Sequence, residues 1–260
     1  WEPSVKYSRL FLEIPAAGQQ AKVFVNGEFV VSHEGGYSAF RADITEKCTE
    51  EFNTIAIWCS NEKCDAIYPQ SADFTFYGGL YRGAHLICVP ETHFELLHYG
   101  DLGIHAATEP ASWDKEDFML HIRTKICGVE KDNQVIYQIF DEDGKEVASA
   151  ARPADSPDTS IPLYKPHRWD IKNSYQYTLK ALIMRNNECL DEVELKFGVR
   201  TFCCDPGRGF LINGNCVPLR GVSRHQDKLY QGNALTKEDH IRDAELIEEI
   251  GANTVRLAHY

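Results

Sequence analysis

The stretch that decides the fold is TKEDHIRDAELIEEIGANTVRLAHY, residues 236–260, in which a helix pattern passes directly into a strand pattern. Thr236 suits a helix N-cap, and Asp239 three residues later completes the spacing of a capping box. Gly251 suits the position just after a last helical turn. Between them, apolar residues recur at helical spacing: Ile241, Ala244, Ile247 and Ile250. We predict a helix over about 237–250 and a strand over 254–260.

A hairpin and another strand precede this helix, in FLINGNCVPLRGVSR (210–224). Asn213-Gly214 predicts a hairpin turn, and the second arm, CVPLRGV, is expected to run on to Arg224 and His225. Strand, helix and strand in this order predict two parallel neighbours joined by a right-handed crossover. His225 and His259 end the two strands, 34 residues apart, about one repeat of a (β/α)8 barrel. We expect residues 201–260 to be the N-terminal part of such a barrel, incomplete by itself.

The two strand ends also carry polar groups that suggest a binding site. Equivalent positions on neighbouring parallel strands lie side by side at the C-terminal face, where barrel enzymes keep their active sites. Arg224 and Arg256 accompany His225 and His259, so two imidazoles and up to two guanidiniums could converge on a sugar-sized hollow. The alternative is that these histidines are hydrogen-bonded loop residues, or that Arg and His form a structural pair. The spacing alone does not decide between the two.

Residues 1–97 have the pattern of an all-β domain. AKVFVNGEFVVSH (21–33) places Asn26-Gly27 between two apolar runs, which is a strong hairpin signal. Further strands are expected in YSAFRADI, NTIAIWC and GAHLICV, each followed or preceded by turn residues. Short strands without a helical period predict a jelly-roll β-sandwich.

Residues 98–200 are expected to form a second β-sandwich, of the immunoglobulin-like kind. DFMLHIRTKI (117–126) alternates, which places Phe118, Leu120, Ile122 and Thr124 on one face. QVIYQIFDEDGKEVASA (134–150) is expected to be a hairpin turning at Asp143-Gly144. About a hundred residues with some six strands fit this fold, and we expect no histidine or charge cluster in the segment, so we assign it the role of a spacer.

Composition excludes several classes of protein. The net charge is −12, and a surface so acidic repels phosphate backbones, so we expect no nucleic-acid partner. No apolar run is long enough for a membrane helix, and we expect no membrane partner. The nine cysteines include no CxxC pair, so we predict no zinc or other metal site. We interpret them as reduced thiols and expect a cytoplasmic protein.

Motifs along nearly the whole chain resemble those of glycoside hydrolase family 2, of the β-galactosidase type. GFLINGNCVPLRGVSRHQD (209–227) and GNALTKEDHIRDAELIEEIGANTVRLAHY (232–260) resemble the first two βα steps of the family's TIM barrel. VFVNGEFVVSHEGGYSAFRADIT (23–45) and DFTFYGGLYR (73–82) resemble its sugar-binding jelly roll, and KFGVR (196–200) resembles the end of its immunoglobulin-like domain. The predicted domains stand in the family's own order.

The resemblance implies a retaining glycosidase that hydrolyses terminal β-galactosides, with a β-linked saccharide as its partner and a homo-oligomer as a possible state. Such enzymes need two carboxylates about 5–5.5 Å apart. In the family both are glutamates on later barrel strands, so we expect them to lie beyond the end of this chain. By the motifs, His225 and His259 would hydrogen-bond sugar hydroxyls, Arg256 would orient the site, and Asp73 would lend a carboxylate from the first domain. No cofactor is expected, since the Mg or Na sites of family members would be held largely elsewhere.

Three departures from the family pattern leave the sugar open. Ser223 stands where the family has Asn before Arg-His, Gln226-Asp227 follows that pair, and Arg82-Gly83 replaces an arginine-aspartate. A β-glucuronidase or a β-mannosidase relative is therefore an alternative.

Two other classes of function also fit the sequence. The chain could be a free-standing carbohydrate-binding module, with Trp58, Tyr68 and Tyr77 as aromatic platforms, or an architectural piece that completes an enzyme with a partner segment. The glutamates at 245, 248 and 249 lie on the crossover helix, which faces away from a barrel mouth, so we do not assign them to catalysis.

Overall fold

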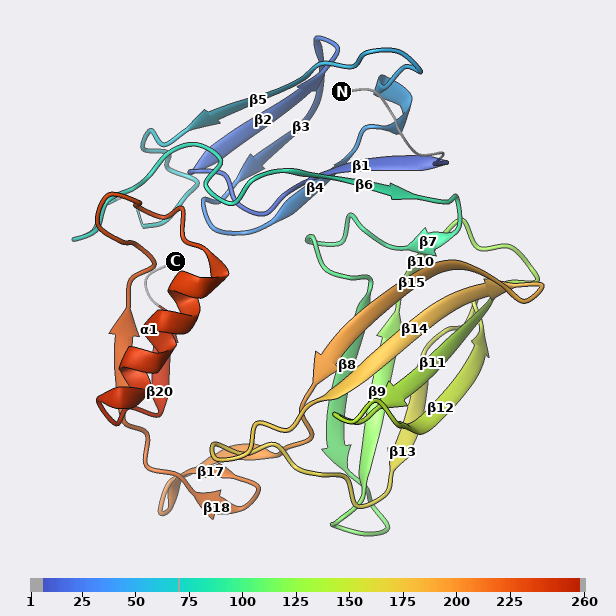
Figure 1. Cartoon of the computed structure of the whole chain (residues 1–260), viewed down its shortest axis with the longest axis vertical. Helices are drawn as coiled ribbons and strands as arrows, with labels where there is room; N and C mark the ends of the chain where they lie inside the picture. The colour runs from blue at the N-terminus through green and yellow to red at the C-terminus, as the bar shows by residue number, and fades with distance from the viewer. Residues whose placement is uncertain (1–6, 70, 258–260) are drawn as a thin grey trace. The chain divides into compact units, whose positions relative to one another are not determined.

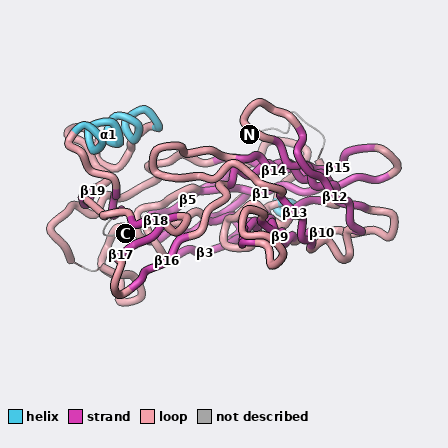
Figure 2. The backbone as a smooth tube through the Cα atoms, turned by 90° about the horizontal axis from the view of Figure 1, so that it is seen from below, coloured by secondary structure: helices cyan, strands magenta, loops and turns pink. Residues whose placement is uncertain are grey.

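The computed structural model describes residues 7–69 and 71–257 and divides into two compact units. The first unit consists of residues 1–88 together with 220–260, and the second of residues 89–219. Strands dominate both units, and α1 is the long helix among the described residues (Figures 1 and 2). None of the helices in that part of the chain combines the length and the apolar character that crossing a membrane would require.

The first unit opens with two three-stranded sheets, in the orders β4-β1-β6 and β3-β2-β5 (Figure 1). Their strands are β1 (Arg9–Ile14), β2 (Gln20–Val25), β3 (Glu28–Glu34), β4 (Phe40–Asp43), β5 (Ile55–Ser60) and β6 (His85–Val89), with the short 3-10 helix η1 at Thr45–Lys47. Alternate side chains of β1 and β2 are buried, and with those of β4 they form one apolar core: Leu10, Leu12, Ile14, Ala21, Val23, Val25, Phe40 and Ala42. Each such side chain contributes about 1.5–3 kcal/mol by leaving water, so this alternation is what holds the sheets face to face.

The predicted hairpin at Asn26-Gly27 is confirmed. Both residues have positive φ, 51° and 85°, as the tightest hairpin turns require, and β2 pairs with β3 on either side of them. The Asn26 amide nitrogen donates 2.9 Å to the Asn53 side-chain oxygen and 2.9 Å to the Lys47 carbonyl. Asparagine is therefore required for its side chain as well as for its backbone.

The first unit also contains a β–α–β piece, β19 (Gly221–Arg224), α1 (Lys237–Glu249) and β20 (Thr254–Leu257). The two strands are parallel, as the sequence predicts. The helix is capped as predicted: the Thr236 side chain accepts from the Asp239 amide, the Asp239 side chain accepts from the Thr236 amide, and Gly251 follows with φ +80°. No side chain of α1 is fully buried.

The second arm of the predicted hairpin is shorter than expected. Only Asn215–Cys216 pairs with the first arm, as β18, and β19 starts separately at Gly221. Pro218 lies between them and has no amide hydrogen to give to a ladder, so CVPLRGV cannot continue as one strand there.

The second unit is built around a four-stranded sheet, β12-β11-β14-β15, and a three-stranded sheet, β13-β9-β8, which face each other in Figure 1. The bounds are β7 (His93–Phe94), β8 (Ile104–Pro110), β9 (Phe118–Thr124), β10 (Ile126–Cys127), β11 (Gln134–Phe140), β12 (Glu146–Pro153), β13 (Thr159–Leu163), β14 (Tyr177–Arg185), β15 (Glu188–Phe197), β16 (Phe202–Asp205), β17 (Gly209–Ile212) and β18 (Asn215–Cys216). The predicted face of β9 is buried, with Phe118, Leu120, Ile122 and Thr124 all inside.

One polar group at the centre of this core is fully satisfied. The Tyr137 ring is buried, and its hydroxyl lies 2.7 Å from the Thr124 hydroxyl and donates 2.9 Å to the Pro157 carbonyl. Burial raises the pKa of Tyr137 to about 12, because the phenolate would have to form inside the sandwich.

The hairpin β16–β17–β18 clusters with the second unit, although the predicted third domain begins at residue 201. Compactness alone does not define a domain, so the domain ranges 1–97, 98–200 and 201–260 stay predictions.

Candidate functional site

The register of β19 and β20 decides which side chains share a face. Ser223 pairs with Arg256 and Arg224 with Leu257, and neighbouring residues of a strand point to opposite faces. Arg224 turns to the helix: its Nε donates 2.8 Å to the Asp243 carboxylate of α1, and its side chain is only 13% exposed. A cavity of about 350 Å³ on this face is lined by Arg224, Leu257 and residues of α1. Ser223 and Arg256 therefore occupy the other face.

Of the two guanidiniums considered for the strand ends, that of Arg224 is turned to the helix. Arg224 is committed to Asp243, so the arginine of β20, Arg256, is the one whose position in the ladder faces away from α1. Arg256 is exposed.

His225 follows β19 directly and meets a loop of the β-sandwich within the same unit. Its imidazole is half-buried, and its ring centroid lies 5.5 Å from that of Phe74, at an interplanar angle of 60°. Phe74 belongs to the segment 71–82, which we call the aromatic loop. The strand end and the aromatic loop are therefore in direct contact.

Two more contacts join the aromatic loop to the segment that follows β19. The Arg82 guanidinium donates 2.9 Å to the Gln226 side-chain oxygen. Gly232, with φ +57°, lies so close to Tyr77 that an added Cβ would stand 2.7 Å from the tyrosine ring. The aromatic loop and the segment after β19 are thus in contact at three points: Phe74 with His225, Arg82 with Gln226, and Tyr77 with Gly232.

The aromatic loop is itself held to the sandwich by three hydrogen bonds, each accepted by a backbone carbonyl. The Gly18 amide donates 2.8 Å to the Gly79 carbonyl, the Asn61 side chain donates 2.9 Å to the Phe76 carbonyl, and the Tyr81 hydroxyl donates 2.5 Å to the Gly36 carbonyl. An added Cβ on Gly18 would lie 2.6 Å from the Gly78 Cα, so no larger residue fits there without moving the loop.

The predicted site residues have the following places. Asp73 is exposed and directly precedes Phe74, the residue that contacts His225. Arg256 lies on the exposed face of β20, and His259 falls outside the described residues. Their roles toward a sugar stay predictions.

Several acidic residues of α1 have structural partners. The Asp239 carboxylate bonds the Lys228 ammonium, the Gln231 amide and the Thr236 amide, and these bonds, with that of Lys228 the strongest, hold the pKa of Asp239 far below its usual range. Glu245 pairs with Arg242 at 3.0 Å on the exposed side of the helix. These carboxylates support the helix and its neighbouring loop.

The aromatic residues considered as sugar platforms differ in their surroundings. Trp58 is partly exposed, with the Lys22 ammonium 5.1 Å from its ring centroid, and Tyr68 is exposed. Tyr77 is half-buried against Gly232. The three residues therefore differ in both exposure and neighbours.

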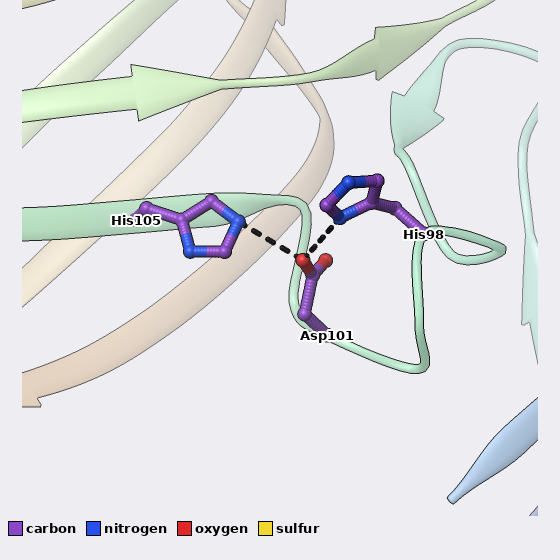
Figure 3. Close-up of side chains that lie close together, drawn as sticks. All are labelled: His98, Asp101 and His105. Carbon is purple, nitrogen blue, oxygen red and sulfur yellow. Dashed lines mark hydrogen bonds and ion pairs between the residues drawn. The ribbon is translucent and has the colours of Figure 1, made fainter.

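The second unit contains a cluster that the sequence reasoning missed, formed by His98, Asp101 and His105. Asp101 Oδ2 lies 2.7 Å from His98 Nδ1 and 2.9 Å from His105 Nε2, so one carboxylate oxygen stands between two imidazoles (Figure 3). Burial tends to raise the pKa of Asp101, but the hydrogen bonds from His98 and the Gly103 amide and the proximity of His105 lower it below its usual range. The signal was the spacing H-x2-D-x3-H, which would place the three side chains on one face of a helix, although here His98 and Asp101 lie in a loop and His105 lies in β8.

Two family models match the chain. The model described as glycosyl hydrolases family 2 matches residues 109–200, and the model of the family 2 TIM barrel domain matches residues 206–260. The chain belongs to glycoside hydrolase family 2. The family named from the sequence motifs is thereby confirmed, and so is the mainly β fold with the start of a TIM barrel.

Relatives within family 2 carry two kinds of name. A β-glucuronidase of Bacteroides fragilis is 32% identical over 99% of this chain and 38% of its own length. A β-galactosidase of Thermoanaerobacter pseudethanolicus is 29% identical over 98% of the chain and 34% of its own length. The crystal structure of an FMN-binding β-glucuronidase from Facaelibacterium prausnitzii L2-6 is 47% identical, with a TM-score of 0.95, over 99% of this chain and 40% of that one. The chain thus spans about two fifths or less of the length of these relatives.

Proposed function

We propose that this chain supplies the sugar-orienting side of a retaining family 2 glycosidase, and that the sugar is a β-linked glucuronide. The observation that carries the proposal is the contact of Phe74 with His225, because it joins a loop of the jelly-roll sandwich to the end of a barrel strand. A sugar bound at that strand end would be within reach of both.

Each predicted residue has a chemical task that suits its place. The His225 imidazole is a group that can hydrogen-bond a sugar hydroxyl, and its packing against Phe74 limits how the ring can turn. The Asp73 carboxylate, one residue before Phe74, can accept two hydroxyl hydrogen bonds. Arg256, on the face of β20 away from α1, supplies a permanent positive charge.

We propose that the catalytic nucleophile and the acid/base are residues of the enzyme other than those of this chain. Retaining glycosidases need two carboxylates about 5–5.5 Å apart across the scissile bond. Two carboxylates of α1 already have partners: Asp243 pairs with Arg224, and Asp239 binds Lys228 and the first turn of the helix. We therefore propose that this chain binds and orients the substrate, and that the 260 residues alone hydrolyse no glycoside.

A glucuronide is preferred to a galactoside for two reasons. The two β-glucuronidases named above are 47% and 32% identical to the chain, and the β-galactosidase is 29% identical. A uronic acid also brings a carboxylate, which an arginine binds as a bidentate partner, and both Arg82 and Arg256 are exposed in the first unit. A β-galactoside is the second candidate, favoured by the 29% identical β-galactosidase.

The test is hydrolysis of 4-nitrophenyl β-D-glucuronide, galactoside and mannoside by the natural protein that contains this chain. We expect the highest kcat/KM with the glucuronide. A higher kcat/KM with the galactoside would replace the proposed sugar, and hydrolysis of none would overturn the proposed activity.

The residue roles are tested with Asp73→Asn and His225→Gln. Each should lower kcat/KM about 10–100-fold, as expected for the loss of a hydrogen bond to a charged or tightly held group. His121→Gln, an exposed histidine of the second unit, is the matched control and should leave kcat/KM unchanged. Unchanged kinetics in both test variants would remove these residues from the site.

A further inference from the structure

The cluster His98–Asp101–His105 has the donor set of a transition-metal site. Two imidazole nitrogens and one carboxylate oxygen lie within 4.8 Å of one another. Around a zinc ion with bonds of about 2.0–2.2 Å, neighbouring ligand atoms stand about 3.3 Å apart. The present separations of 2.7 and 2.9 Å from Asp101 Oδ2 open to that value by small rotations of the two rings.

The loop that carries two of the three residues is held in one conformation. Tyr99, Gly100 and Gly103 all have positive φ, of 51°, 67° and 68°. An added Cβ on Gly103 would lie 2.7 Å from the Glu95 carbonyl oxygen, and the Gly103 carbonyl accepts 2.8 Å from the Lys125 amide. The backbone is therefore clamped on both sides, which lowers the entropy lost when the side chains close on an ion.

The carboxylate is oriented by a further partner. Asp101 Oδ1 accepts 2.8 Å from the Gly103 amide, which leaves Oδ2 directed between the two imidazoles (Figure 3). A partner of this kind, which fixes a ligand without touching the ion, is typical of metal sites.

We propose that His98, Asp101 and His105 bind one divalent transition-metal ion of the zinc class. His98 would use Nδ1, His105 Nε2 and Asp101 Oδ2. On binding, the proton on each coordinating nitrogen moves to the other ring nitrogen, and any proton of an imidazolium is released to water. Two nitrogen ligands disfavour Ca²⁺ and Mg²⁺, which prefer all-oxygen sites.

The remaining coordination positions open to a cavity of about 480 Å³, lined by His98 and His105 and by Arg123 of β9. Arg123 pairs with His105 across the strands, so its positive charge stands beside the ion. That charge weakens binding of a bare cation and favours an anion, such as hydroxide or a carboxylate, as the exogenous ligand. We expect a Kd below about 10 μM for zinc, weaker than for four-ligand structural sites.

The alternative is a purely structural triad, in which the carboxylate bridges two imidazole N–H groups. That arrangement needs no ion, and it predicts no stoichiometric binding. The two alternatives therefore differ in a direct titration.

The test is calorimetric titration of the full 260-residue chain with ZnCl₂, after alkylation of accessible thiols with iodoacetamide. Alkylation is required because Cys189, Cys203, Cys204 and Cys216 are exposed and could bind zinc themselves. We expect one zinc ion per chain. MgCl₂ in place of ZnCl₂ should give no heat of binding.

His105→Ala and His98→Ala should each weaken zinc binding by more than about tenfold, the smallest loss usual even for outer partners of a ligand. His121→Ala removes a third imidazole that lines the same cavity but lies outside the cluster, and it should bind as the unaltered chain does. Circular dichroism checks that each variant is folded. If His105→Ala does not fold, the zinc titration of His98→Ala provides the test. Absence of 1:1 binding, or equal binding by the folded His98 and His105 variants, would overturn the proposal. Neither result bears on glycoside hydrolysis.

Discussion

Gly18→Ala should displace the aromatic loop and so disturb the candidate sugar site from a distance. The new Cβ would lie 2.6 Å from the Gly78 Cα and closer still to the Tyr77 carbonyl oxygen, and real Cβ atoms essentially never approach below 3.0 Å. Both obstacles are backbone, so no side chain can turn aside. The loop must retreat by about half an ångström, and the 2.8 Å hydrogen bond from the Gly18 amide to Gly79 lengthens with it.

The expected cost is about 1–3 kcal/mol in the unfolding free energy of the first unit, which is the usual range for overpacking. Hydrogen exchange measured by mass spectrometry should show faster exchange over residues 71–82. Because displacements of about 1 Å can cost as much as 100-fold in rate, kcat/KM of the natural protein should fall by about one to two orders of magnitude.

Gly79→Ala is the matched control, on the other side of the same backbone bridge. Gly79 has φ +83° and nothing within 4 Å of an added Cβ. This variant therefore loses only about 1–2 kcal/mol of stability, from the strain of a left-handed backbone at alanine, and displaces no neighbouring atom. Equal exchange over residues 71–82 in the two variants would refute the argument that Gly18 clamps the loop.

Three further predictions concern the interior and the helix. Tyr137→Phe leaves the Thr124 hydroxyl and a carbonyl without their partner, and should lower the unfolding free energy in urea by about 1–3 kcal/mol. The folded pKa of about 12 exceeds the unfolded value near 10, so the contribution of Tyr137 is complete below pH 10 and is lost between about pH 10 and 12; stability curves of the Phe variant should lack this component. Thr236→Ala removes the acceptor of the Asp239 amide and should weaken α1 by about 1 kcal/mol, visible as faster amide exchange at its first turn. Arg224→Met breaks the pair with Asp243 and should speed exchange throughout α1, whereas exchange in the second unit stays unchanged.

Local sequence was enough to predict the elements whose cause is local. Asn26-Gly27 and Asn213-Gly214 form turns because both positions need positive φ, which these residue types tolerate. Thr236 and Asp239 start α1 because their side chains bond the first helical amides. The parallel pairing of β19 with β20 follows from the crossover helix between them.

Features that depend on distant partners were not predictable from the pattern. Arg224 and His225 are neighbours in sequence, yet only the strand register shows that Arg224 faces the helix. Phe74 and His225 are brought together by anchors that come from Gly18, Asn61 and Gly36, far away in the chain. The His98–Asp101–His105 cluster depends on a loop with left-handed residues, whose side-chain directions no periodicity describes.

The way the aromatic loop is anchored has a consequence for how substrate preference can evolve. The hydrogen bonds that hold the loop are accepted by main-chain carbonyls, those of Gly79 and Phe76 in the loop and that of Gly36 outside it. Main-chain carbonyls are the same for every amino acid, so exchanges of loop side chains other than Tyr81, whose hydroxyl donates one of these bonds, leave the support unchanged. Point changes at the outward positions of the loop can therefore present new side chains beside His225 without moving the backbone that carries them.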